Sequence, residues 1–346
     1  MSGANAELGK AMLDAAQLAL FTTGGDRLTL VPRDTAGTAE GAATAAKAVI
    51  ADGVGLILGP LLAAEVEAVK PLARDANINV IAFSTATQLA GGNVFLMGFL
   101  PRQEAQREVG FARERGVERF AALASNTAYG HLMADSMRDA VKEAGGMVTK
   151  VEYFDARGTD TSTAIQRLVQ GPASAAAPAA AAPPTTDGFD ALLLPEGGPR
   201  LKQLAQQLKR AGVDTSRVRL LGSGLWDDPS IAGEPALAGG WFAASPPEGR
   251  RDFEGRYQAA YNRAPPRLAS LAFDSAALAA VLVKNEGGQP FSQQAIQNPN
   301  GFTGVDGLFR FTQAGLVQRG LAVLEVAPQG AVVVSPAPAS FANLGF

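Results

Sequence analysis

The stretch DGVGLILGPLLAAEVEAVKPLARDANINVIAFSTAT, residues 52–87, decides the fold. Its apolar run Val54 to Leu58 predicts a buried strand, which a Gly-Pro pair ends. Apolar residues then recur at helical spacing from Ala64 to Ala76, and a second apolar run, Asn79 to Phe83, leads into the polar residues 84–87. A strand, a helix and a strand within about 30 residues are typical of a βαβ unit with parallel strands.

The same alternation extends in both directions from this unit. Before it, residues 7–21 have an apolar helical face, Leu28-Thr29-Leu30-Val31 predicts a strand and residues 38–52 predict a helix. After Pro101, four further strand signals alternate with helices as far as Leu221. The sequence therefore predicts an α/β protein with two Rossmann-like lobes, each built on a parallel sheet.

The last hundred residues are expected to return to helices and then to form a hairpin. Residues 307–312 and 321–326 are the expected hairpin strands, with the turn at 313–315. A different feature interrupts the second lobe, because residues 171–186 consist mainly of alanine, proline, serine and threonine. Such a segment cannot bury enough apolar surface to become ordered, so we expect a flexible surface loop there.

Composition excludes several classes of function. The 346 residues include 47% hydrophobic residues, which suits two domains with buried cores. The chain has 30 Lys and Arg against 33 Asp and Glu, and it lacks a basic cluster, so we expect no nucleic-acid partner. With no cysteine and a single histidine, His131, we expect neither a metal site nor a cofactor.

Enzyme motifs are absent from the sequence. It contains no GxxxxGK[ST] phosphate loop, no GxSxG nucleophile elbow and no GxGxxG dinucleotide motif after a strand. Asp227-Asp228 can be interpreted as an acid–base pair or a cation site, or as helix-capping residues before Pro229. We expect that the protein is not an enzyme.

Neither a membrane-spanning segment nor a signal peptide is expected in this chain. No run approaches the roughly 18–20 apolar residues that a spanning helix needs. The first residues also lack a charged segment followed by an apolar core.

Polar or glycine-rich turns follow five of the predicted strands. In open α/β sheets ligands bind at the carboxyl ends of the strands, and two such lobes form a cleft between domains. The alternative is that these are ordinary βα turns. The five turns are residues 59–64, 84–87, 126–130, 195–198 and 222–228.

Nearly the whole chain resembles the type I periplasmic solute-binding proteins of the leucine/isoleucine/valine-binding kind. The resemblance rests on SGANAELGKAMLDAAQLAL (2–20), residues 52–87, AYGHLMADSMRDAVKEAGG (128–146) and GVDGLFRFTQAGLVQRGLAVLEV (304–326). A narrower branch, the penicillin-binding protein activators, is similar to this chain at residues 82–101, 220–244 and 336–341.

The resemblance implies two lobes with three hinge crossovers, which close about a ligand. Lobe one is expected at residues 1–100 plus 247–304, and lobe two at 101–246 plus 305–346, with the flexible loop 171–186 inside lobe two. In related proteins a strand precedes the first loop, whereas this chain opens at Met1. We therefore expect that the first strand of lobe one is missing, which leaves neighbouring edges unpaired.

The resemblance also implies a changed pocket. The serine and threonine that hold the ligand carboxylate in the amino-acid binders fall on Ala63 and Ala86, and the acidic residue that holds the ammonium falls near Gly224. Tyr129 matches the cleft tyrosine of the family. A zwitterion would then be desolvated without partners, so we expect a neutral or weakly polar ligand and not a branched-chain amino acid.

The candidate ligand contacts come from the turns of both lobes. The hydroxyl groups among them are expected to form hydrogen bonds, and the two aromatic residues to supply flat apolar surface. The candidates are Asn5, Ser84, Thr85, Thr87, Tyr129, Glu196, Trp226 and Asp227.

Two functions follow from the resemblance. The first is a non-enzymatic periplasmic ligand-binding protein that works with an ABC-transporter permease. The alternative is a penicillin-binding protein activator, an interaction protein that stimulates a peptidoglycan synthase and has a vestigial cleft. Either function implies a location in the periplasm or at a lipid anchor of the cell envelope.

Overall fold

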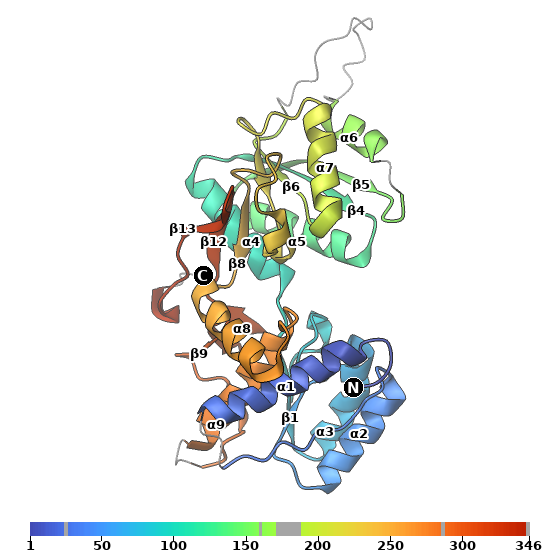
Figure 1. Cartoon of the computed structure of the whole chain (residues 1–346), viewed down its shortest axis with the longest axis vertical. Coiled ribbons are helices and arrows are strands. Elements are labelled where there is room, and N and C mark those ends of the chain that lie inside the picture. Colours follow the sequence, from blue (N-terminus) through green and yellow to red (C-terminus); the bar gives the residue numbers. More distant parts are fainter. Residues whose placement is uncertain (24–26, 159–160, 171–187, 285–287, 344–346) are drawn as a thin grey trace, which may run out of the picture. The chain divides into compact units, whose positions relative to one another are not determined.

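The computed structural model describes residues 1–23, 27–158, 161–170, 188–284 and 288–343. The expected loop at 171–186 lies outside these residues. The chain divides into two compact units (Figure 1). Unit 1 comprises residues 1–100, 245–320 and 338–346, and unit 2 comprises residues 101–244 and 321–337.

Unit 1 contains a parallel three-stranded sheet of order β1-β2-β3 between two layers of helices. Side chains alternate between the layers: Ile81 and Phe83 pack with α1, α8 and α9, whereas Val80 and Ala82 pack with α2 and α3. Figure 1 shows α2 and α3 together on one side of β1. The elements are α1 (Ala6–Thr23), α2 (Ala39–Ala51), β1 (Leu56–Leu58), α3 (Ala63–Asp75), β2 (Asn79–Ala82), η1 (Thr87–Leu89), β3 (Val94–Leu96), α8 (Pro247–Tyr261), α9 (Ala269–Lys284), α10 (Gln293–Ile296) and η4 (Phe341–Asn343).

The strand expected at Leu28 to Val31 is not formed. Among the described residues, no strand and no backbone–backbone hydrogen bond includes residues 28–33, and β1 pairs only with β2. A strand requires a hydrogen-bonded neighbour, and the apolar composition that predicted this one cannot supply it.

A second, antiparallel sheet completes unit 1 and corrects two expectations. It has the order β11-β10-β9, and Phe309 of β10 pairs with Arg319 of β11. The hairpin expected between residues 307–312 and 321–326 is therefore wrong. The second segment of this unit was expected to end at residue 304. It ends at residue 320 instead, because these short strands pair with one another inside unit 1. The strands are β9 (Phe302–Gly304), β10 (Gly307–Phe311) and β11 (Val317–Arg319).

Unit 2 contains a seven-stranded sheet of order β13-β12-β8-β7-β6-β4-β5. The five strands from β8 to β5 are parallel, and β12 and β13 add an antiparallel edge. Helices α6 and α7 pack in one buried cluster, and α4 and α5 pack in another. The elements are α4 (Pro101–Glu114), β4 (Arg119–Ser125), α5 (Ala128–Glu143), β5 (Met147–Phe154), α6 (Ser162–Val169), β6 (Ala191–Leu193), α7 (Gly198–Arg210), β7 (Arg219–Leu221), η2 (Gly224–Trp226), η3 (Pro229–Ile231), β8 (Trp241–Ala244), β12 (Ala322–Ala327) and β13 (Gly330–Ser335).

A buried ionic cluster joins the sequence-distant segments of unit 1. Arg319 is buried at the end of β11, and its Nη2 donates to the Met97 carbonyl at 2.7 Å. Asp306 is fully buried and pairs with Arg267 at 2.8 Å. Asp274 of α9 accepts hydrogen bonds from the backbone N–H groups of Val305 and Asp306, at 2.7 and 3.3 Å. These contacts hold the segments at 97, 267–274 and 305–319 together.

The two carboxylates of this cluster titrate differently. Burial, reinforced by the charge of Asp306, raises the pKa of Asp274 to about 7. Burial alone would also raise the pKa of Asp306, but the guanidinium groups of Arg267 and Arg319 outweigh it and lower that pKa. Asp274 is thus the carboxyl group whose proton the fold retains toward neutral pH.

Replacing Asp274 by asparagine is expected to change how stability depends on pH. The unfolded chain titrates this group near its ordinary pKa of about 4, so the native protein loses stability as pH rises from about 4 to about 7. Asp274→Asn removes this loss, and the variant should gain about 2 kcal/mol relative to the parent between pH 5 and pH 8. Urea unfolding at pH 5 and at pH 8 measures the gap in unfolding free energy between the variant and the parent, with exposed Asp135→Asn as the control. A gap that is the same at both pH values would contradict the prediction.

Candidate functional site

The carboxyl ends of β4, β6 and β7 lie at one edge of the unit 2 sheet, because the three strands are parallel neighbours. After β4, the chain turns into α5, and Thr127 caps this helix by accepting a hydrogen bond from the Gly130 N–H at 3.0 Å. A Cβ atom on Gly130 would lie 2.0 Å from the Ser125 carbonyl oxygen. The turn therefore needs glycine, and it fixes Tyr129 on the first turn of α5.

Two glutamates of α4 reach this edge from beneath the loop after β7. The Glu108 Oε1 accepts from the Gly222 N–H at 3.0 Å, and the Glu104 Oε2 accepts from the Gly224 N–H at 2.9 Å. Both glutamates are buried. They lie four residues apart, so one face of α4 presents two carboxyl groups to residues 222–224.

A third carboxylate comes from the loop after β6. The Glu196 Oε1 accepts from the Ser125 N–H at 3.2 Å, and its Oε2 lies 3.9 Å from Arg200 Nε. Glu196 thereby links the loops that follow β4 and β6. Tyr129 and Glu196 therefore lie at the same edge of the sheet, and their role as ligand contacts stays a prediction.

The buried acidic groups at this edge raise the pKa values of their neighbours. Burial raises the pKa of Glu108 well above its usual range, and the neighbouring Glu104 charge adds to the effect. Burial and the charge of Glu104 likewise raise the pKa of Tyr129, so its hydroxyl stays protonated, and a hydrogen bond with Ser223 only partly offsets this increase. Hydrogen-bond acceptors of negative or neutral charge dominate this edge, which favours a ligand group that donates hydrogen bonds.

The structure corrects the role expected for Trp226. Its side chain is only 1% exposed and belongs to the core of unit 2, where its Nε1 donates to the Leu194 carbonyl at 3.1 Å. An indole buried in this way cannot supply a wall for a ligand. Asp227 is half-buried, and its role stays a prediction. Asp228 caps η3 by accepting from the Ser230 N–H at 2.8 Å, which agrees with the capping interpretation.

In unit 1 the loop after β2 carries three of the expected residues. Ser84 is buried, and its Oγ accepts from the Ala86 N–H at 3.2 Å, so it stabilises the loop. Thr85 and Thr87 are exposed and can meet a ligand. Asn5 is exposed in the loop before α1.

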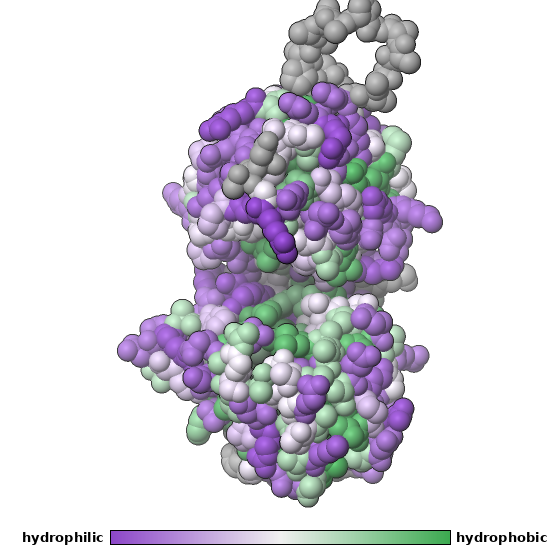
Figure 2. All heavy atoms as spheres, turned by 90° about the vertical axis from the view of Figure 1, so that its right-hand side faces the viewer, coloured by the Kyte–Doolittle hydropathy of each residue, from purple (hydrophilic) through white to green (hydrophobic). Residues whose placement is uncertain are grey.

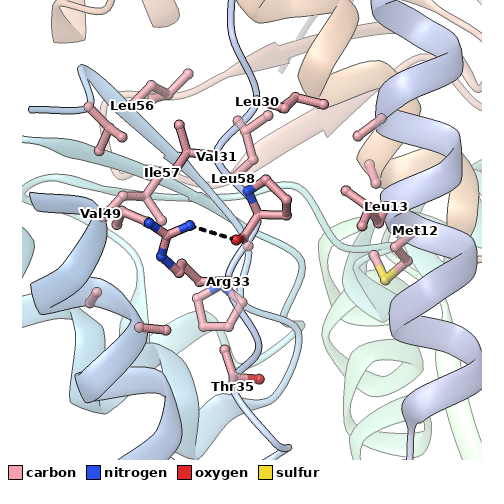
Figure 3. Close-up of a pocket in the computed structure, with 18 of the residues that line it drawn as sticks. Met12, Leu13, Leu30, Val31, Arg33, Thr35, Val49, Leu56, Ile57 and Leu58 are labelled. Carbon is pink, nitrogen blue, oxygen red and sulfur yellow. Dashed lines mark hydrogen bonds between the residues drawn. The ribbon is translucent and has the colours of Figure 1, made fainter. Parts of the chain in front are cut away.

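A cavity in the described part of unit 1 is not formed by this loop. It measures about 520 Å³, and its lining includes Asn5 but none of the other expected residues. Figure 3 shows Leu30 and Val31 of the irregular segment, Leu56 and Ile57 of β1, and Met12 of α1 around it.

Two kinds of feature are absent from the described part of the chain. Within the described ranges, no three His, Asp or Glu side chains are grouped so that they could hold a metal ion. Nor does any described helix combine the length and apolar character that a membrane crossing requires.

The sequence profile of the periplasmic binding protein family matches residues 1–331. The chain belongs to this family. Among curated proteins, no sequence matches the chain.

Solved structures share the fold of this periplasmic binding protein over nearly its whole length. An ABC transporter substrate-binding protein from Sphaerobacter thermophilus has 22% identity and a TM-score of 0.77, with 97% of this chain and 95% of that chain covered. A branched-chain amino acid ABC transporter periplasmic ligand-binding protein from Burkholderia xenovorans has 18% identity and a TM-score of 0.77, with 97% and 93% covered. A solute-binding protein of an ABC transporter from Rhodopseudomonas palustris, in complex with 3,4-dihydroxybenzoic acid, has 18% identity and a TM-score of 0.67, with 97% and 94% covered.

Sequence reasoning missed Glu104 and Glu108 of this binding protein. Charged residues on a helix usually face solvent, which hides the role of these two. The sequence signal that could have revealed them is the helical spacing of Glu104, Glu108 and Phe111. These three residues form one stripe of the helix, and it ends in a buried aromatic side chain. Two acidic residues in an apolar stripe predict buried carboxyl groups with specific partners.

The turn that positions Tyr129 gives a stability prediction. Gly130→Ala is expected to destabilise unit 2 by about 2 kcal/mol or more, because the new methyl group collides with the Ser125 carbonyl. Gly110→Ala in α4 is the matched control: nothing lies within 4 Å of its Cβ position, and alanine should stabilise the helix by about 0.5–1 kcal/mol. Urea unfolding compares the two. Equal effects of the two substitutions would show that the turn does not require glycine.

Proposed function

We propose that the chain is a non-enzymatic, ligand-binding component of an ABC transport system and that it binds a small molecule. The observation that carries the proposal is the family match over residues 1–331, together with polar loops at the carboxyl ends of the parallel strands. A periplasmic location and an ABC permease as partner form part of the same proposal. The solved relatives named above are solute-binding proteins.

The ligand is recognised in unit 2 through Tyr129, Glu196 and Glu104, and Thr85 and Thr87 of unit 1 stay separate candidates. The unit 2 groups are carboxyl and hydroxyl groups next to backbone N–H groups that are already bonded. They suit a ligand with hydroxyl or amino donors and repel a carboxylate. A neutral or weakly polar molecule with hydrogen-bond donors fits best.

A branched-chain amino acid fits poorly. Ala63 and Ala86 stand where the resemblance places the hydroxyl groups that hold a carboxylate. In unit 1 the Ala86 N–H already donates to Ser84, so it does not replace the lost hydroxyl. The carboxylate of leucine would therefore be desolvated without a partner.

The activator alternative rests only on the sequence resemblance at residues 82–101, 220–244 and 336–341. The solved relatives named above are ABC-transporter binding proteins, which supports the ligand-binding role instead.

Calorimetry with leucine, isoleucine and valine tests the ligand class. We expect no heat of binding for any of the three at micromolar concentrations. A thermal-shift screen of neutral hydroxylated and amino compounds, with 3,4-dihydroxybenzoate as an anionic comparison, should give its hits among the neutral compounds. Micromolar binding of one of the three amino acids would contradict the assignment of Ala63 and Ala86.

A substitution at Glu104 tests the unit 2 contacts with any hit from that screen. Glu104→Gln retains an oxygen for the Gly224 N–H, so the fold should persist. Loss of the charge should weaken binding by about tenfold, which corresponds to about 1.4 kcal/mol. Exposed Glu114→Gln, on the same helix, is the matched control and should bind as the parent does. Unchanged affinity of Glu104→Gln would exclude this carboxylate from the site.

A further inference from the structure

Strand β13 forms one end of the seven-stranded sheet of unit 2 (Figure 1). Among the described residues it pairs with β12 alone. Its sequence, GAVVVS, carries no charge, and the three successive residues Ala331, Val332 and Val333 are exposed. The exposed fractions of the two valines are 48% and 41%. Because successive side chains of a strand point to opposite faces, apolar side chains are uncovered on both faces of the sheet at this edge.

The hydrogen bonds of β12 show which backbone groups of β13 point to the open edge. Val326 of β12 donates its N–H to the Gly240 carbonyl and accepts from the Gly239 N–H, both at 2.9 Å, so both of its backbone groups are directed toward β8. Val326 lies opposite Ala331. In an antiparallel ladder such a pair is not hydrogen-bonded, so the N–H and C=O of Ala331 point away from β12. Two residues further along the strand, the N–H and C=O of Val333 point the same way.

The opposite edge of the same sheet, strand β5, is protected by charged side chains. Lys150 of β5 donates from its Nζ to the Arg167 and Leu168 carbonyls of α6, at 2.7 and 3.1 Å. Glu152 of β5 accepts from Arg167 Nε at 2.8 Å. Figure 2 shows the side of unit 2 that carries α6 and α7, and hydrophilic residues cover most of it. Charged side chains at a sheet edge oppose pairing with another chain, and β13 has none of them.

We propose that β13 pairs with β13 of a second copy of this chain, antiparallel about a two-fold axis between the two Val332 residues. In this register Ala331 of each copy lies opposite Val333 of the other, and the outward N–H and C=O groups of these residues form the ladder. Val332 then lies opposite its own counterpart in a non-hydrogen-bonded pair, where side chains approach each other most closely. The same segment serves on both sides, as a two-fold dimer requires.

A second copy suits this edge because two uncharged, identical strands meet without repulsion and cover each other's valines. The edge is also held in place before pairing, since Arg107 of α4 donates to Ser335 Oγ at 2.6 Å and to the Leu321 carbonyl at 2.9 Å. One short strand from each copy gives a contact smaller than the roughly 800 Å² per partner of stable complexes, so we expect a weak dimer with a Kd of about 100 µM. This inference does not depend on the proposed ligand-binding function.

Sedimentation equilibrium of the full chain, from about 5 µM to about 1 mM, measures this association. Val332→Lys and Val332→Glu each place like charges opposite one another, and each variant alone should associate about tenfold more weakly than the parent. An equimolar mixture of the two variants should recover the dimer, because lysine then lies opposite glutamate. Val281→Lys, at a similarly exposed valine of α9 in unit 1, is the matched control and should dimerise as the parent does.

Val333→Pro tests the backbone hydrogen bonds of the proposed dimer. The N–H that proline lacks points to the open edge, so circular dichroism should show a folded chain, while association should weaken about tenfold. A parent that stays monomeric at about 1 mM would overturn the proposal, as would undiminished dimers of Val332→Lys. Failure of the mixed lysine and glutamate variants to associate would overturn the register about Val332.

Discussion

Parallel pairing of buried strands is the constraint on which the rest of this protein depends. Parallel strands require a crossover between each pair, so every loop that follows a strand arrives at the same edge of the sheet. In unit 2 this edge collects Tyr129, Glu196 and the loop 222–228 from three separate strands. The site is thus a consequence of topology, and single side chains adjust its chemistry.

Buried acidic groups show how such an adjustment is made. In the loop at 222–224, Glu104 of α4 accepts from the Gly224 N–H, and Glu108 shares the Gly222 N–H with the Trp241 carbonyl of β8. A buried carboxyl group is tolerated only when hydrogen bonds compensate for its desolvation. Glu104 also contributes to the acidic character of this edge, so the loop geometry and the proposed ligand preference are coupled through this residue.

Helices and strands were predicted well where apolar residues recur at a clear spacing. They were predicted less well where hydrogen bonding to a neighbouring strand decides whether a strand forms. The helices and strands of residues 52–87 follow directly from local pattern, as does the loop 84–87. The apolar period alone cannot show whether a strand has a neighbour. For this reason the sequence pattern did not predict that Leu28 to Val31 is irregular or that β10 pairs with β11. Trp226 was misassigned for a related reason: an aromatic residue in a glycine-rich turn can point either to solvent or to the core, and here Gly222 leaves room for the indole to pack inward.

The order of the strands in unit 2 has a consequence for biosynthesis. Strand β8 is synthesised before residue 245, but its second neighbour, β12, begins at Ala322, after 77 residues that belong mainly to unit 1. While the ribosome makes those residues, β8 remains an unpaired edge with a largely apolar sequence. Unit 2 therefore reaches its final sheet only after β12 and β13 have been made, and a chaperone that shields Trp241 to Ala244 during that interval would protect the nascent chain from association through this edge.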